Sequence, residues 1–361
     1  MARIGIIDDW VNPKYLSEKL RIRYIFVEES EKGRKDPDES LFTHATVIAK
    51  ILEQQAKDYE VLNFVLARCM DEPVDIQTLK KALEFCQREK IDILCMSLGT
   101  DRISERNYIY PLICKLYERD VILIAAADND GHYMLPAALD EVIGVDVVLE
   151  EPQYPGKYYL CENNLWNIDL QADCRFPVQL KGRDIYPSTS YAVPVIAAQV
   201  NNFLNQGFRG QEKIRIQLRK YAADCRTVRQ GMEENEAENS LPVVGSNELA
   251  EKEWVTLMDL MQSQFGLEVI GLDISGKIKD GRFLKFGRQK EKKWEDMLCW
   301  VECYTVAEVV FVSLAEEKEE CDILIRKTGK GNYQCTVPEI QKEVYIEELA
   351  KICEWIVDTL S

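Results

Sequence analysis

The first part of the chain alternates short apolar runs with longer stretches in which apolar residues recur every three or four positions. Short runs rich in Val, Ile and Leu are typical of buried strands, and the longer period is typical of amphipathic helices. The pattern predicts strands at Ile4–Ile7, Val61–Ala67, Ile91–Met96, Val121–Ala126 and Val142–Val148. It predicts helices at Ala45–Gln55, Ile76–Arg88, Tyr108–Arg119, Ser190–Leu204 and Gln211–Ala223. Because this alternation implies right-handed crossovers, we expect an α/β fold with a mostly parallel sheet between two helical layers.

An acidic segment interrupts this pattern. Residues 232–240 contain four glutamates and no basic residue, which is typical of a solvated linker. Beyond it we predict strands at Val243–Gly245, Leu267–Leu272, Val309–Leu314 and Asp322–Arg326, a hairpin at Asp280-Gly281, and helices near Glu248–Phe265, Trp294–Tyr304 and Ile346–Leu360. We therefore expect a large domain at 1–225, a linker at 226–241 and a smaller α/β domain at 242–361.

Composition and charge exclude several classes of protein. Hydrophobic residues make up 46% of the 361 residues, which is enough for packed cores and excludes a disordered protein. The chain has 62 acidic and 45 basic residues and a formal charge of −17. Because such a chain has no net attraction to phosphate groups, we exclude nucleic acid and membrane surfaces as partners and expect basic peptides instead.

The sequence contains no pattern typical of a signal peptide or a membrane span. Asp8 and Asp9 interrupt the apolar run at the N-terminus, and the longest apolar stretch, Val121–Ala127, is too short to cross a bilayer. The 12 cysteines are scattered without repeated Cys-x-x-Cys spacing, so we interpret them as reduced thiols. These features predict a cytoplasmic protein.

Four residues stand where side-chain chemistry is expected. Asp8 ends a buried strand, where a carboxylate is costly unless it is paired or functional. His44 lies where a helical pattern begins, Asn129 follows a strand, and Ser190 stands among small residues that open a helix. A serine in that place lies near backbone N–H groups that suit an oxyanion. Each residue alone also has an ordinary interpretation as a helix cap, a turn residue or a satisfied polar side chain.

Taken in chain order, these segments resemble the motifs of the subtilisin-like serine proteases (subtilases). The resemblance covers about residues 1–224, and the matching segments are Ile6-Ile7-Asp8, His44-Ala45-Thr46-Val47-Ile48-Ala49, Met96-Ser97-Leu98-Gly99, Ala125-Ala126-Ala127-Asp128-Asn129-Asp130-Gly131, Pro136 to Val145, and Ser188-Thr189-Ser190-Tyr191-Ala192-Val193-Pro194. The order Asp, His, Ser is also the order of the catalytic triad in subtilisins.

The resemblance implies a three-layer subtilisin-like domain with serine endopeptidase activity. Ser190 would be the nucleophile, His44 the general base and Asp8 its orienting carboxylate. It also implies that Asn129 binds the oxyanion, and that the specificity pocket is lined by Ser97, Leu98, Gly99, Asp128 and Asp130. We expect no cofactor and no catalytic metal, and the calcium sites of the family are not assigned to residues of this chain.

The sequence departs from the family pattern near the triad. Ser188, Ala45 and Asp128 replace glycines, and Val47 replaces a histidine, but Asp8, His44, Asn129 and Ser190 are all retained. An active peptidase is therefore predicted, and the alternative is a catalytically silent peptide-binding protein. The side chain at position 128 has two interpretations: it favours cleavage after Lys or Arg, or it caps its own loop.

The N-terminal position of the predicted catalytic strand leads to the substrate hypothesis. The strand begins at residue 4, so we expect an enzyme without a prodomain that folds unaided inside the cell, and the alternative is a trimmed mature form. Compact subtilases with an appended α/β module resemble the processing peptidases of bacterial peptide maturation. This resemblance implies a peptide or protein substrate, in particular a ribosomal precursor peptide, and a C-terminal domain that recognises it.

Overall fold

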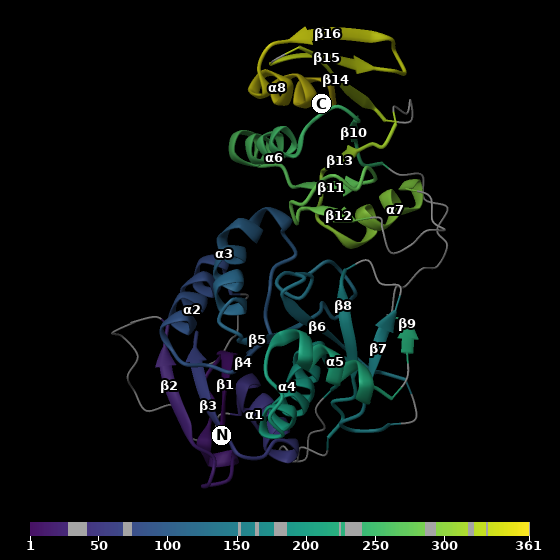
Figure 1. Ribbon diagram of the computed structural model, residues 1–361. Helices are drawn as coiled ribbons and strands as arrows, with labels where there is room; N and C mark the ends of the chain where they lie inside the picture. Colours follow the sequence, from purple (N-terminus) through teal and green to yellow (C-terminus); the bar gives the residue numbers. More distant parts are fainter. Residues whose placement is uncertain are drawn as a thin grey trace. The chain divides into compact units, whose positions relative to one another are not determined.

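The computed structural model divides the chain into two compact units (Figure 1). It describes residues 1–27, 42–67, 74–150, 153–162, 166–176, 186–223, 225–227, 240–285, 294–316, 321–329 and 331–360. Unit 1 comprises Met1–Thr100 and Glu105–Gly231, and unit 2 comprises Asp101–Ser104 and Met232–Ser361. Most of the predicted linker at 226–241 lies outside the described residues. Within those residues, no helix has the length and apolar composition needed to cross a membrane.

Unit 1 is built on a nine-stranded sheet, counted over the described residues. Its strands are β1 (Ala2–Asp8), β2 (Ile22–Phe26), β3 (Tyr59–Val65), β4 (Ile93–Met96), β5 (Ile122–Ala126), β6 (Val142–Val147), β7 (Tyr158–Glu162), β8 (Ile168–Ala172) and β9 (Cys225–Thr227). They lie in the order β2-β3-β1-β4-β5-β6-β8-β7-β9. The β7–β8 pair is antiparallel and the other pairs are parallel.

Helices cover both faces of this sheet (Figure 1). They are α1 (His44–Gln55), α2 (Ile76–Arg88), α3 (Arg106–Tyr117), α4 (Thr189–Asn205) and α5 (Gln211–Tyr221). Side chains alternate along a strand, so Ile4 and Ile6 of β1 join one core with buried residues of α1 and α4. The opposite side of β1, at Gly5, faces Phe64 and Leu94, and α2 and α3 pack against that face of the sheet. The predicted three-layer α/β architecture is confirmed.

The parallel strands bring the chemistry-bearing segments to one edge of the sheet. Strand β1 lies between β3 and β4, and β4 pairs with β5. Residue Ile7 is in register with Met96, and Met96 with Ala125. Because the three strands run in the same direction, Asp8, Ser97 and the loop that begins at Ala127 all emerge at their carboxyl ends, where ligands bind in open α/β sheets.

Unit 2 is a second, smaller α/β unit. Its elements are β10 (Val243–Ser246), α6 (Glu251–Phe265), β11 (Val269–Asp273), β12 (Phe283–Lys285), α7 (Trp294–Tyr304), β13 (Val309–Ser313), β14 (Ile323–Gly329), β15 (Asn332–Val337), β16 (Lys342–Ile346) and α8 (Leu349–Leu360). The strand order is β12-β11-β13-β10-β14-β15-β16, and β15 is antiparallel to both of its neighbours, β14 and β16. Helices α6 and α8 pack together, and Trp254 and Ile356 share a core with Phe311 of β13.

Two predictions for unit 2 are wrong. Strand β12 pairs parallel to β11, so Asp280-Gly281 is not the turn of a hairpin. Arg282 explains the local geometry, because its buried guanidinium binds the carboxylates of Asp280 and Asp259 and anchors the connection there. The last helix begins at Leu349 rather than Ile346, because Ile346 is the final residue of β16 and pairs with Tyr333.

Gly99 has no room for a side chain, which generates a stability prediction. A Cβ at this position would lie 2.1 Å from the backbone oxygen of Leu135, and Thr100 exchanges two backbone hydrogen bonds with Leu135 beside it. We expect Gly99→Ala to lower the free energy of unfolding by more than about 2 kcal/mol, because backbone must move. Urea unfolding measures this change.

Gly207→Ala is the matched control for Gly99→Ala. Gly207 has φ +96 and open space around its Cβ direction, so the substitution costs only the backbone strain of about 1–2 kcal/mol. Equal costs for the two variants would contradict the steric explanation.

Candidate active site

A buried carboxylate binds the ring of His44 at the carboxyl end of β1. His44 Nδ1 lies 2.9 Å from Oδ2 and 3.0 Å from Oδ1 of Asp8. The Asp8 side chain is fully buried, whereas 28% of the His44 side chain is exposed. The carboxylate therefore selects the tautomer with a proton on Nδ1 and leaves Nε2 as the basic nitrogen.

The first residues of α1 are held against the segment that follows β1. Thr43 caps the helix by accepting the N–H of Thr46, and its own hydroxyl donates to the backbone oxygen of Trp10. The carboxylate of Asp9 accepts the N–H groups of His44 and Ala45 at 3.3 and 2.8 Å. These contacts place the His44 backbone beside Asp8, so the imidazole contact follows from local capping rather than from side-chain reach.

Asn63 of β3 holds the same segment from the other side. This fully buried amide accepts the N–H of Val11 at 2.9 Å and donates to the backbone oxygen of Asp9 at 3.0 Å. Buried polar groups need such partners, because a missing hydrogen bond costs about 1–3 kcal/mol. Asn63 thereby fixes the direction in which the chain leaves β1.

Two adjacent carboxylates and the imidazole influence one another. Burial and the neighbouring charge of Asp8 raise the pKa of Asp9 to about 6 from its usual 3.8, even though the α1 N–H groups oppose this shift. Burial lowers the pKa of His44, but its hydrogen bond to Asp8 and the charges of Asp8 and Asp9 outweigh burial, and the net pKa is raised above 6.5. The site therefore favours a protonated imidazolium once a proton arrives.

Ser190 lies in the first turn of α4, close to the end of β4. Its hydroxyl donates to the backbone oxygen of Ser97 at 3.2 Å, and the Ser97 hydroxyl donates to the backbone oxygen of Ser190 at 3.3 Å. Across the described residues the Ser190 hydroxyl makes no hydrogen bond with His44. The neighbouring Tyr191 ring packs against the His44 ring, with centroids 5.0 Å apart.

Asn129 and α4 are joined by a fixed hydrogen-bond pattern. The N–H and the hydroxyl of Thr189 both donate to Asn129 Oδ1 at 3.1 Å. The amide oxygen is thus occupied, and the Nδ2 end of this exposed residue is the end available to a ligand. This arrangement can stabilise negative charge that develops beside Ser190.

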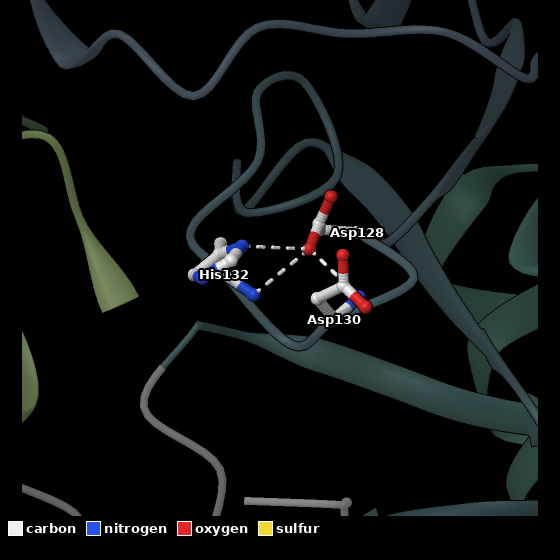
Figure 2. A group of neighbouring side chains, drawn as sticks. All are labelled: Asp128, Asp130 and His132. Carbon is white, nitrogen blue, oxygen red and sulfur yellow. Dashed lines mark hydrogen bonds and ion pairs between the residues drawn. The ribbon is translucent and has the colours of Figure 1, made fainter. Parts of the chain in front are cut away.

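The loop after β5 binds its own backbone through Asp128 (Figure 2). Asp128 Oδ2 accepts the N–H of Asp130 at 2.8 Å and of His132 at 3.2 Å, and lies 3.1 Å from His132 Nδ1. These contacts are those of the loop-capping interpretation. That Asp128 and Asp130 line a specificity pocket stays a prediction. The three side chains are also close enough to one another to hold a metal ion, but Asp130 and His132 are exposed and the hydrogen bonds account for their grouping.

The structure brings the predicted residues together in two clusters at one sheet edge. Asp8 contacts His44, Ser190 contacts Ser97, and Asn129 contacts the residue before Ser190. The sequence interpretation missed the roles of Asp9, Asn63 and Thr189. A second aspartate directly after Asp8 was a visible signal for the first, but Asn63 lies in another strand and is recognised only after folding.

Part of this chain is similar in sequence to a known protein. No protein-family model matches the chain. An 82-residue stretch, 22% of the chain, is 34% identical to the minor extracellular protease Epr of Bacillus subtilis (strain 168), of which it spans 12% of the length.

Solved structures of proteases also align with part of the chain. They include the prenylagaramide maturation protease PagA (18% identity, 59% of this chain and 80% of that one, TM-score 0.43). A lanthipeptide protease aligns with 14% identity, over 61% and 79% of the two chains and with a TM-score of 0.47. A cold-adapted subtilisin-like serine proteinase aligns with 16% identity, over 62% and 84% and with a TM-score of 0.47.

The raised pKa of Asp9 predicts a pH-dependent cost in stability. Its folded pKa of about 6 exceeds the unfolded value of 3.8, so the folded protein binds the proton more tightly. The free energy of unfolding should therefore fall by about 3 kcal/mol as the pH rises from 4 to above 6. Asp9→Asn should remove the contribution of Asp9 to this fall and lower the pKa of His44, because the Asp9 charge raises it.

Urea unfolding between pH 4 and 7.5 and an NMR titration of the imidazoles measure both effects. The chain has two histidines, so the His132 signal serves as the internal control. An unchanged stability slope, or a His44 pKa that rises in Asp9→Asn, would contradict the prediction.

Proposed function

We propose that this chain is a subtilisin-like serine endopeptidase that hydrolyses peptide bonds through Asp8, His44 and Ser190. The observation that carries the proposal is the 2.9 Å contact between His44 Nδ1 and the buried carboxylate of Asp8, at the sheet edge where Ser190 lies in the first turn of α4. A buried carboxylate is costly unless it is paired, and this one is paired with an imidazole whose tautomer it selects. The local similarity to the protease Epr supports the same chemistry.

Acylation begins when the Ser190 hydroxyl turns from the Ser97 carbonyl toward His44. Its oxygen attacks the peptide carbonyl carbon while its proton moves to His44 Nε2, and the carbonyl oxygen becomes an oxyanion. Asn129 Nδ2 and the Ser190 N–H are the donors for that oxyanion. His44 then gives the proton to the leaving amine, the C–N bond breaks, and an ester to Ser190 remains.

Hydrolysis repeats the sequence with water. His44 Nε2 takes a proton from the water as its oxygen attacks the ester, and it returns the proton to Ser190 Oγ when the ester bond breaks. Asp8 accepts the Nδ1 hydrogen bond and stabilises the imidazolium in both halves. Because the contacts of Asp8 and Asp9 raise the pKa of His44, activity should decline on the acid side with a midpoint above pH 6.5.

A catalytically silent peptide-binding protein is the second candidate. Two contacts favour it: the Ser190 hydroxyl donates to Ser97, and the Ser190 N–H donates to the side chain of Ser188. Both groups are needed for catalysis and both are occupied within the chain. Reaction with a fluorophosphonate probe separates the candidates, because only an active serine attacks the phosphorus.

We further propose that the substrate is a peptide, and that unit 2 binds part of it. Unit 2 has a core of its own, and the sequence assigns it no catalytic set. A ribosomal precursor peptide remains our hypothesis for the natural substrate, and mapping the cut sites in a peptide library tests it most directly.

Removal of the nucleophile provides the first test. Ser190→Ala deletes one hydroxyl in the first turn of α4 and should leave the melting temperature within about 2 °C, while peptide hydrolysis falls by at least about 10³-fold. Fluorophosphonate labelling of the native protein should map to Ser190 and be lost in the variant. Retained hydrolysis in Ser190→Ala would reject the triad.

The acidic loop generates a prediction about specificity. The side chain of Asp128 caps the loop, and Asp130 is exposed beside it. We expect kcat/KM to be higher for peptides with Lys or Arg than with Leu or Phe before the cut. The ratio is measured on substrates that differ only at that residue.

Variants of the loop separate charge from loop structure. Asp130→Asn removes the charge of a side chain that does not cap the loop. It should lower the preference for Lys or Arg over Leu or Phe several-fold. Asp128→Asn serves as the comparison that also weakens the loop hydrogen bonds. A native preference for Leu or Phe, or a ratio unchanged in both variants, would show that the loop does not line the pocket.

A further inference from the structure

The side chain of Ser188 accepts a hydrogen bond from a backbone N–H that the proposed reaction needs for the oxyanion. It is the N-cap of α4 in extended conformation, and its Oγ accepts the N–H of Ser190 at 3.2 Å. An N-cap side chain ordinarily satisfies the second or third N–H of its helix. Here the second N–H belongs to the nucleophile itself, and it is the backbone donor that the oxyanion would use.

The other oxyanion donor is arranged in the opposite way. Asn129 Oδ1 is occupied by the N–H and hydroxyl of Thr189, which leaves its Nδ2 toward ligand. One donor is thus preset for substrate while the other is bound to Ser188. The nucleophilic hydroxyl of Ser190 is also occupied, because it donates to the backbone oxygen of Ser97.

We infer that Ser188 is a positioning residue that holds the Ser190 N–H in the free enzyme and thereby slows acylation. The inference rests on the proposed serine hydrolase function. An oxyanion that accepts this N–H must displace the Ser188 hydroxyl or share the donor with it. A net hydrogen bond of ordinary strength corresponds to about a five-fold change in rate. A residue without a hydroxyl at position 188 should therefore speed the step.

A fluorophosphonate measures this step without knowledge of the natural substrate. Ser190 Oγ forms a bond to phosphorus, the P–F bond breaks, and fluoride leaves with the electron pair. The hydroxyl proton passes to His44, and the phosphoryl oxygen takes the place of the oxyanion. The second-order rate constant of labelling is measured on the full-length chain by fluorescence of the attached probe.

Three variants of Ser188 test the inference. Ser188→Ala and Ser188→Gly remove the acceptor and should label about five-fold faster than the native protein. Ser188→Thr keeps a hydroxyl and should restore the slower rate. Ala should lower the melting temperature by about 2–4 °C because it is a poor helix cap, whereas Gly caps almost as well and should lower it less. Gly also serves if the Ala variant folds poorly.

Asp75→Ala is the matched control for helix capping. Asp75 caps α2 by accepting the N–H of Thr78 at 2.8 Å, and within the described residues it makes no hydrogen bond to a residue of the site. It should lose a similar few degrees of melting temperature with no change in labelling rate. If Ser188 had only a structural role, Ser188→Ala would likewise lower the melting temperature without changing the labelling rate, because loss of a cap does not accelerate a reaction.

Each outcome of labelling decides a separate point. Faster labelling of the Ala and Gly variants supports the inference, and labelling of these variants alone supports it in its strongest form. Equal or slower labelling of folded Ala and Gly variants beside a labelled native protein overturns the inference and leaves the proposed function standing. If folded native protein and all folded variants fail to label at Ser190, the proposed function is rejected and the inference with it.

Discussion

The contact between the buried carboxylate of Asp8 and His44 is the interaction on which the rest of the site depends. A fully buried charge at the end of a central strand costs several kcal/mol unless it has partners. The imidazole provides one, and the N–H of Asp9 donates to Asp8 Oδ1 at 2.8 Å as another. The fold must therefore bring the first residue of α1 to the end of β1, and Thr43, Asp9 and Asn63 serve that requirement.

The second carboxylate, that of Asp9, holds α1 in position beside Asp8, but it also lowers the free energy of unfolding at neutral pH. Asp9 caps α1, but its burial next to another acid raises its pKa to about 6. The two acids together raise the basicity of His44. Stability and basicity are thus opposed at neutral pH, as is common where a site is built for chemistry rather than for the fold alone.

Helix α4 combines structural and chemical functions in one turn. Thr189 orients Asn129, Ser190 holds the nucleophilic hydroxyl, and Ser188 caps the helix through the nucleophile's N–H. A glycine cap would leave that N–H open, whereas a serine cap stabilises the helix and occupies it. A serine at position 188 therefore raises the stability of the helix and lowers the availability of an oxyanion donor.

Hydrophobic periodicity by itself determined the alternation of strands and helices, because buried strands and amphipathic helices have different repeats. It therefore predicted β1, α1, β4, β5 and α4 to within a few residues. The motifs around Asp8, His44, Asn129 and Ser190 also indicated the chemistry, because that chemistry requires particular residue types. The parallel pairing of β12 and the end of β16 at Ile346 escaped prediction, since strand direction and pairing depend on residues distant in the chain.

Only the tertiary structure decided how the side chains of the site are used. Asn63 binds the segment after β1 from a neighbouring strand, Asp128 turns into its own loop, and Ser188 takes the N–H of Ser190. The sequence allows several partners for each of these polar groups. A hydrogen bond is chosen by distance, direction and burial within about 3 Å, and these are set when separate segments pack together.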